Sequence, residues 1–193
     1  GRQTRQKGLP YLLRALDGLP DDVQVVLTAG APDTPEIAAE VASLVEALRR
    51  NRSRVVLIDR MVPQADLAAI LTAATLFLCP SIYEPLGIVN LEAMACETAV
   101  VASAVGGIPE VVRDQTTGLL VPYDPAQAGD PAYVEDFEAA FAQSVNALLR
   151  DPARARAMGE AGRRRCIDHF DWAKIARQTV DVYEQAITAH LSR

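Results

Sequence analysis

The sequence lacks the features that mark membrane, secreted and zinc proteins. No apolar run approaches the ~20 residues that a helix needs to cross a bilayer, and the first residues, GRQTRQKG, do not have the pattern of a signal peptide. The cysteines are few and widely spaced, at Cys79, Cys96 and Cys166, and they form no CxxC pair. We therefore expect a cytoplasmic protein with reduced thiols, no membrane span and no zinc site.

The motifs of several enzyme classes are absent as well. The sequence contains neither a GxGxxG dinucleotide fingerprint nor a Walker phosphate loop. Both histidines, His169 and His190, fall in the C-terminal part, so no Ser-His-Asp or Cys-His set can be assembled near the strands. No carboxylate cluster has the spacing of a metal site. What remains are binding and electrostatic groups, which for an enzyme suggests that a further part supplies the rest.

The composition indicates one globular domain. The chain has 193 residues, and its 50% of hydrophobic residues is enough for a real core. The formal net charge of −6 disfavours a nucleic-acid partner or an anionic membrane surface, since both attract basic proteins. Because the chain has no initiator methionine, we expect it to be a piece of a longer polypeptide.

Short apolar, β-branched runs alternate with helical stretches over the first 125 residues. Strands are expected at 23–29, 54–58, 75–79, 98–103 and 118–121, and helices at 9–16, 35–50, 64–74, 88–96 and, after a glycine turn, within 106–113. Three longer helical segments follow, at 133–150, 152–170 and 172–191. This alternation predicts an α/β fold: a Rossmann-like parallel sheet with helices on both faces, followed by a helical C-terminal tail. In such folds the ligand lies beyond the carboxyl ends of the strands.

The stretch SIYEPLGIVNLEAMACE (81–97) carries two carboxylates on either side of a predicted helix start. A helix N-terminus binds phosphates or hydroxyls through its free N–H groups, and Gly87 lets a ligand approach the backbone. Glu84 and Glu92 could then accept hydrogen bonds from a diol. Each glutamate alone is more simply a solvated charge near a helix end; the pair with Pro85 and Gly87 between them favours a site.

Three other loops could contribute at the same edge. Arg2 and Lys7 lie in a predicted loop and could bind an anion such as a diphosphate, although a solvated basic loop is an equal alternative. The glycine pair in SAVGGIPEVV, which includes Gly107, allows close approach of a ligand, but a tight turn is the simpler interpretation. Met61 follows another strand and could flank a base, whereas nearby Asp66 more simply helps to start a helix.

Taken in order, GRQTRQKG, YEPLGIVNLEAMA, GGIPEVV and TGLLV resemble the carboxyl-terminal half of a retaining GT-B glycosyltransferase of family four. The resemblance covers nearly the whole chain. Within this family, AGAPDTPE and the stretch from DRMVPQADL to EAMA resemble actinobacterial glycogen synthases, which are close to the maltose-1-phosphate synthases.

The resemblance implies that residues 1–193 form the donor-binding domain, and that an N-terminal acceptor domain is absent from this chain. Arg2 and Lys7 would hold the donor diphosphate and, with Glu84, act in catalysis. Glu84 would bind the hexose with the backbone of Leu86, Gly87 and Ile88. The remaining donor contacts it implies are Glu92 at the ribose, Met61 at the base, and Gly107. No metal or other cofactor is implied, because fixed cations replace it, and the last helix would pack on the missing domain.

The expected reaction is transfer of glucose from ADP-glucose to an α-1,4-glucan or to glucose-1-phosphate, with the isolated chain inactive. Two alternatives stay open: a UDP- or GDP-sugar transferase acting on a lipid or small acceptor, and a non-catalytic nucleotide-binding module. The resemblance also implies that the usual first strand of the sheet, just before Gly1, is missing, which would leave a sheet position open or filled by another chain.

Overall fold

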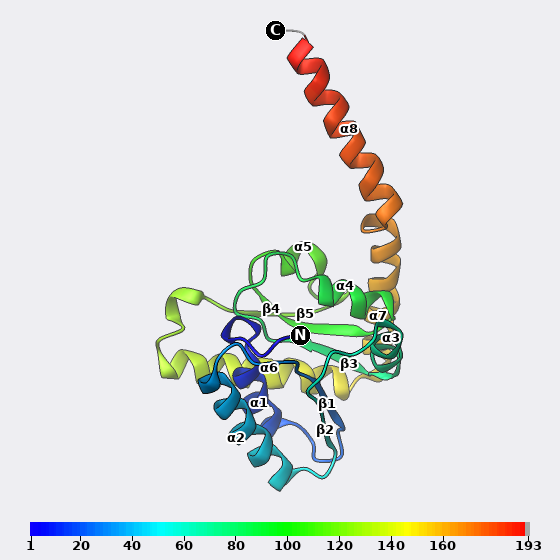
Figure 1. Ribbon diagram of the computed structural model, residues 1–193. Helices are drawn as coiled ribbons and strands as arrows, with labels where there is room; N and C mark the ends of the chain where they lie inside the picture. The colour runs from blue at the N-terminus through cyan, green and yellow to red at the C-terminus, as the bar shows by residue number, and fades with distance from the viewer. Residues whose placement is uncertain (192–193) are drawn as a thin grey trace.

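The computed structural model describes residues 1–191, which alternate strands and helices before ending in three long helices (Figure 1). The strands are β1 (Val25–Thr28), β2 (Val55–Ile58), β3 (Leu76–Cys79), β4 (Ala99–Ala104) and β5 (Gly118–Pro122). The helices are α1 (Leu9–Ala15), α2 (Pro35–Asn51), α3 (Gln64–Ala73), α4 (Ile88–Ala95), α5 (Ile108–Val111), α6 (Pro131–Leu149), α7 (Pro152–His169) and α8 (Trp172–Leu191). Short 3₁₀ turns lie at η1 (Arg5–Lys7), η2 (Leu16–Gly18) and η3 (Pro125–Gln127).

The expected sheet is divided in two. Strand β1 pairs in parallel with β2, and β3, β4 and β5 form a second parallel sheet with β4 in the centre. Helix α6 packs on one face of β4 and β5, and α4 and α5 lie on the other face (Figure 1). The α/β fold with parallel strands, covering helices and a helical tail is thus confirmed, while one continuous sheet is not observed because no described strand joins β1 to β3.

A cavity of about 630 Å³ lies between the two sheets. Its walls include the whole of β1 and β3 together with apolar residues of α1 and α3. The backbone at Gly1 leads toward this cavity beside the end of β1: the nitrogen of Gly1 donates to the Thr28 carbonyl at 3.0 Å, and the Gly1 carbonyl accepts from Gly30 at 2.8 Å. These two hydrogen bonds hold Gly1 against the end of β1.

The core explains why the elements form where the sequence predicts them. Strand β4 (AVVASA) is buried from Ala99 to Ser103, as expected for a central parallel strand covered on both faces. Helix α2 begins with Thr34 as N-cap, whose hydroxyl accepts from the Ile37 N–H, and buries a stripe of four apolar side chains. The element boundaries differ from the predicted ones by one or two residues.

Helix α8 extends away from the rest of the molecule (Figure 1). Its side chains are largely exposed, including the apolar residues Trp172, Val180, Val182, Tyr183 and Ile187. Among the helices of residues 1–191, neither α8 nor any other combines the length and the apolar character needed to cross a bilayer.

Candidate functional site

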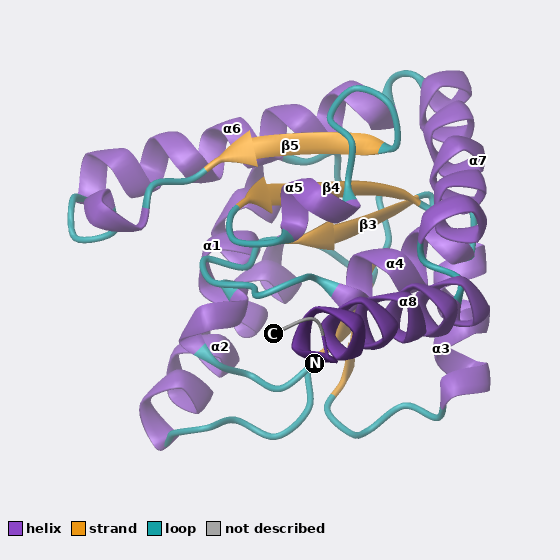
Figure 2. Ribbon diagram, turned by 90° about the horizontal axis from the view of Figure 1, so that it is seen from above, coloured by secondary structure: helices purple, strands orange, loops and turns teal. Residues whose placement is uncertain are grey.

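Three loops meet at the carboxyl ends of the strands: residues 4–8 before α1, residues 80–87 between β3 and α4, and residues 105–107 between β4 and α5. Figure 2 shows the last two loops beside the ends of β3 and β4. The Ile82 N–H donates to the Gln6 carbonyl at 2.8 Å, and the Gly107 N–H donates to the Glu84 carbonyl at 3.0 Å. The middle loop, which carries Glu84, is thus hydrogen-bonded to both of its neighbours.

Glycines make this close approach possible. A Cβ on Gly8, whose φ is +64°, would lie 1.9 Å from the Pro80 carbonyl oxygen. Cβ atoms on Gly106 and Gly107 would lie 2.0 Å from the Glu84 oxygen and 2.2 Å from the Pro85 oxygen. Distances this short are steric clashes, so the glycine pair of the sequence makes room for the Glu84 loop. Contact of Gly107 with a donor remains a prediction.

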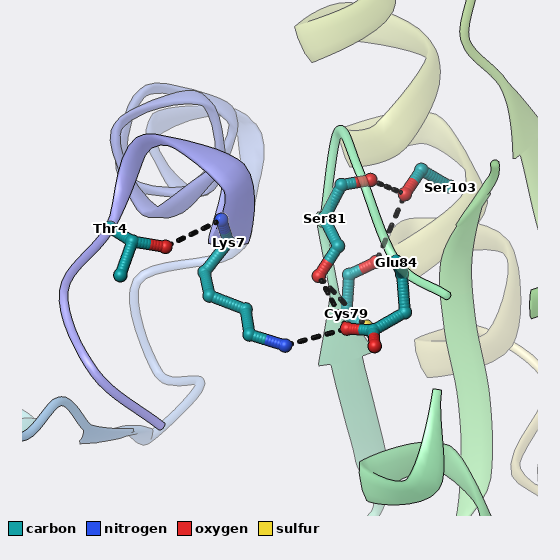
Figure 3. Close-up of polar contacts among 6 residues, drawn as sticks. All are labelled: Thr4, Lys7, Cys79, Ser81, Glu84 and Ser103. Atoms are coloured by element: carbon teal, nitrogen blue, oxygen red, sulfur yellow. Dashed lines mark hydrogen bonds and ion pairs between the residues drawn. The ribbon is translucent and has the colours of Figure 1, made fainter. Parts of the chain in front are cut away.

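Lys7 and Glu84 form an ion pair at the centre of these loops (Figure 3). Lys7 Nζ lies 2.6 Å from Glu84 Oε2, which joins residues 77 positions apart in the chain. The Glu84 side chain is only 10% exposed and that of Lys7 39% exposed. Lys7 and Glu84, to which the resemblance gives separate ligand contacts with the diphosphate and the hexose, thus neutralise each other in this structure.

A buried hydroxyl holds the base of the Glu84 loop. Ser103, fully buried near the end of β4, donates to the carbonyls of Cys79, at 3.4 Å, and Ser81. Strand pairing ends at Cys79 because Pro80 has no N–H to continue the ladder, and Ser103 takes over the contact. Ser81 Oγ in turn lies 3.5 Å from Glu84 Oε2 (Figure 3). Sequence reasoning missed both serines, although a polar residue in the run VVASA was a signal.

The start of α4 offers free donors next to Glu84. Gly87 is the N-cap in the left-handed region, with φ +91°. Within residues 1–191, no recorded acceptor takes the N–H groups of Leu86, Gly87 and Ile88. The side chains of Leu86 and Ile88 are 37% and 60% exposed. This end of the helix can therefore receive an anion or hydroxyl groups through its backbone and its dipole.

The structure places the remaining predicted residues at varying distances from this centre. Arg2 is exposed, forms an ion pair with Asp33 at 3.0 Å, and lines the cavity between the sheets. Exposed Glu92 and partly buried Lys7 both line the cavity between the sheets. Met61 is 89% exposed, and its side chain has few neighbours in this chain.

The site contains cations and carboxylates but no metal-ligand cluster within residues 1–191, where no three His, Cys, Asp or Glu side chains come together. Burial raises the pKa of the Cys79 thiol beneath the loop, which disfavours a thiolate nucleophile there. The arrangement can bind a ligand that has a phosphate near a polyhydroxyl group.

Comparisons with known proteins identify relatives of this chain. Residues 1–151 match the family described as "Glycosyl transferases group 1". The α-maltose-1-phosphate synthase of Mycolicibacterium smegmatis is 57% identical over 185 residues, which cover 96% of this chain and 46% of that protein. The chain therefore spans about half the length of this relative.

Solved structures share the fold over nearly the whole chain. Sucrose-phosphate synthase from Thermosynechococcus elongatus is 34% identical with a TM-score of 0.79, covering 98% of this chain and 44% of that one. Anabaena HepE, solved in complex with UDP-glucose, is 22% identical with a TM-score of 0.78, covering 96% and 47%. The second likeness shows the fold alone.

Proposed function

The chain belongs to the group 1 glycosyl transferases, and from this premise we propose that it is the donor-binding domain of a retaining glucosyltransferase. The observation that carries the proposal is the Lys7–Glu84 pair beside the free N–H groups at the start of α4. A cation, a carboxylate and a helix N-terminus at the carboxyl edge of a parallel sheet suit a nucleotide diphosphate sugar.

In this proposal the donor separates the ion pair. The diphosphate draws Lys7 Nζ, and the hexose hydroxyls donate to the freed Glu84 carboxylate. The backbone N–H groups of Leu86, Gly87 and Ile88 donate to the hexose hydroxyls. Glu92, which lies further along α4, accepts from the ribose diol. As the nucleoside diphosphate leaves, charge develops on its phosphate, and a fixed cation stabilises that charge without a metal. Arg2 joins Lys7 only after it leaves Asp33.

We further propose ADP-glucose as the donor and glucose-1-phosphate or an α-1,4-glucan as the acceptor, in the cytoplasm. The 57% identity to a protein named α-maltose-1-phosphate synthase supports the choice of product. A UDP-sugar donor with a small acceptor is the second candidate, and the 34% identity to a sucrose-phosphate synthase favours a small acceptor.

The acceptor would bind in a second domain that precedes this chain. Two features support this division. The chain matches about half of its relative's length, and the exposed apolar residues of α8 give a second domain a surface to pack on. Met61 and the exposed Leu86 and Ile88 would then face the cleft between the domains.

The test is a transfer assay with the complete natural polypeptide that contains this chain. ADP-, UDP- and GDP-glucose are each offered with glucose-1-phosphate, a maltodextrin or no acceptor, and the products are separated. We expect transfer from ADP-glucose and loss of transfer in a Lys7→Ala variant. Transfer from UDP-glucose alone would select the second candidate, and no transfer from any donor would contradict the proposal.

A further inference from the structure

Asn90, in the first turn of α4, has a buried side chain without a partner. It is 0% exposed, and neither its Nδ2 nor its Oδ1 has a hydrogen-bonding partner in the described part of the chain. Buried polar groups in native proteins nearly always have partners, so an orphaned amide points to a partner gained in another state. The function proposed above assigns Asn90 no role.

The position of Asn90 suggests what that partner is. The Cβ that Gly87 lacks would lie 2.7 Å from Asn90 Nδ2 and 3.6 Å from Glu84 Cγ. The amide and the Glu84 side chain therefore both lie against Gly87, where a Cβ would clash with the amide. On the other side of the amide lies the Cys79 thiol, whose pKa burial raises and which offers only a weak hydrogen bond.

Glu84 loses its strongest contact when a donor binds. Two side chains contact its carboxylate, both at Oε2: Lys7 Nζ at 2.6 Å and, at the longer distance of 3.5 Å, Ser81 Oγ. If Lys7 turns to the diphosphate, a carboxylate that is 10% exposed keeps only the long contact. A buried carboxylate needs hydrogen-bond donors, and the Asn90 amide, whose polar neighbour is the weakly bonding Cys79 thiol, can donate one hydrogen bond.

We propose that Asn90 is a positioning residue for sugar transfer. When Lys7 engages the diphosphate, Asn90 Nδ2 donates to the Glu84 carboxylate and fixes its orientation toward the hexose hydroxyls. This inference rests on the proposed function, because it requires Lys7 to leave Glu84 on donor binding. Asn90 should therefore affect the binding and transfer of the nucleotide sugar but not the binding of the nucleoside diphosphate.

The experiment compares Asn90→Leu with Tyr123→Phe. Leucine has the branched shape of asparagine but a larger volume, and it has no hydrogen-bond donor. Tyr123→Phe removes the other orphaned buried polar atom of the described chain, which lies in an aromatic cluster with Tyr11 and Phe137. Thermal unfolding, affinity for nucleoside diphosphate and for nucleotide sugar, and turnover are measured in the complete natural polypeptide. Asn90→Ala serves as a second variant, because it adds no atoms if leucine prevents folding.

We expect Tyr123→Phe to keep or raise the melting temperature, because it removes an unpaired polar group, whereas the larger leucine and the smaller alanine at position 90 should each lower it through altered packing. Only the Asn90 variants should lower nucleotide-sugar affinity and turnover, by about tenfold for one hydrogen bond to a charged group. Nucleoside diphosphate affinity should stay within about twofold of wild type, since the diphosphate does not contact Glu84.

Two results would overturn the inference in distinguishable ways. If the wild type binds nucleotide sugar and both Asn90 variants bind and transfer it as well as wild type, the amide has no positioning role and the proposed function stands. If the wild type binds neither nucleoside diphosphate nor nucleotide sugar, the proposed function fails and this inference fails with it.

Discussion

The Lys7–Glu84 pair predicts an asymmetric loss of stability when either partner is removed. Lys7→Met leaves a carboxylate that is 10% exposed, with only the long contact to Ser81. Removing one partner of a buried pair destabilises by about 3–5 kcal/mol, whereas an exposed pair contributes about 0–1 kcal/mol. Because this pair is partly exposed on the lysine side, we expect Lys7→Met to lower the free energy of unfolding by about 3 kcal/mol.

Glu84→Gln should lower the free energy of unfolding less than Lys7→Met does. It keeps an acceptor, and the Lys7 ammonium, 39% exposed, can turn to water. We expect a loss of about 1 kcal/mol, and about 2 kcal/mol for the double variant, because removing both charges leaves no unpaired ion. For a chain of this length, each kcal/mol corresponds to about 2–4 °C in melting temperature.

Urea denaturation of the four proteins measures this coupling as a double-mutant cycle. The matched control is the exposed Arg2–Asp33 pair, with side chains 73% and 39% exposed, whose coupling should stay below about 1 kcal/mol. The reasoning is refuted if Glu84→Gln destabilises as much as Lys7→Met, or if the losses of the two single variants add in the double variant.

Further predictions concern other parts of the chain. Gly107→Ala should lower the free energy of unfolding by about 3 kcal/mol in urea denaturation, because its Cβ would lie 2.2 Å from the Pro85 oxygen. The control Gly129→Ala, with open space around it, should change that free energy by less than about 0.5 kcal/mol. Equal losses in the two variants would contradict the account. Burial raises the pKa of Cys166 to about 11, so the stability that its neutral thiol contributes is present below pH 9, the ordinary value, and is lost as the pH rises to 11. The melting temperature should therefore fall less between these pH values in Cys166→Ser than in wild type. An equal fall in the two proteins would refute this. Trp172, the single tryptophan, is 83% exposed, so its fluorescence should be that of a solvated indole here and should shift to the blue in the complete polypeptide; an unshifted spectrum would argue against docking of α8.

Local patterns predicted the elements well because they depend on neighbouring residues. The apolar run of β4 and the helical stretch of α2 both predicted their elements, and the order of four motifs identified the family. The division into two sheets was not predictable locally, because it depends on whether β1 and β3 find a common partner.

The candidate site could be predicted as a set of residues but not as an arrangement. Sequence indicated Lys7 and Glu84 separately, and the resemblance gave them different ligand contacts. Their direct pairing depends on two loops 77 residues apart, which are brought together where Gly8 packs against Pro80. Ser103 and Asn90 were missed because a buried polar side chain is recognised only when its surroundings are known.

The most direct test of a donor site is a calorimetric titration of this chain with ADP, UDP and GDP, repeated with Glu92→Ala. The account predicts that ADP binds more tightly than UDP and GDP. It also predicts that Glu92→Ala lowers the affinity for ADP by about tenfold, because the ribose contact is lost. Failure of all three nucleotides to bind, or equal ADP affinity in both proteins, would contradict it.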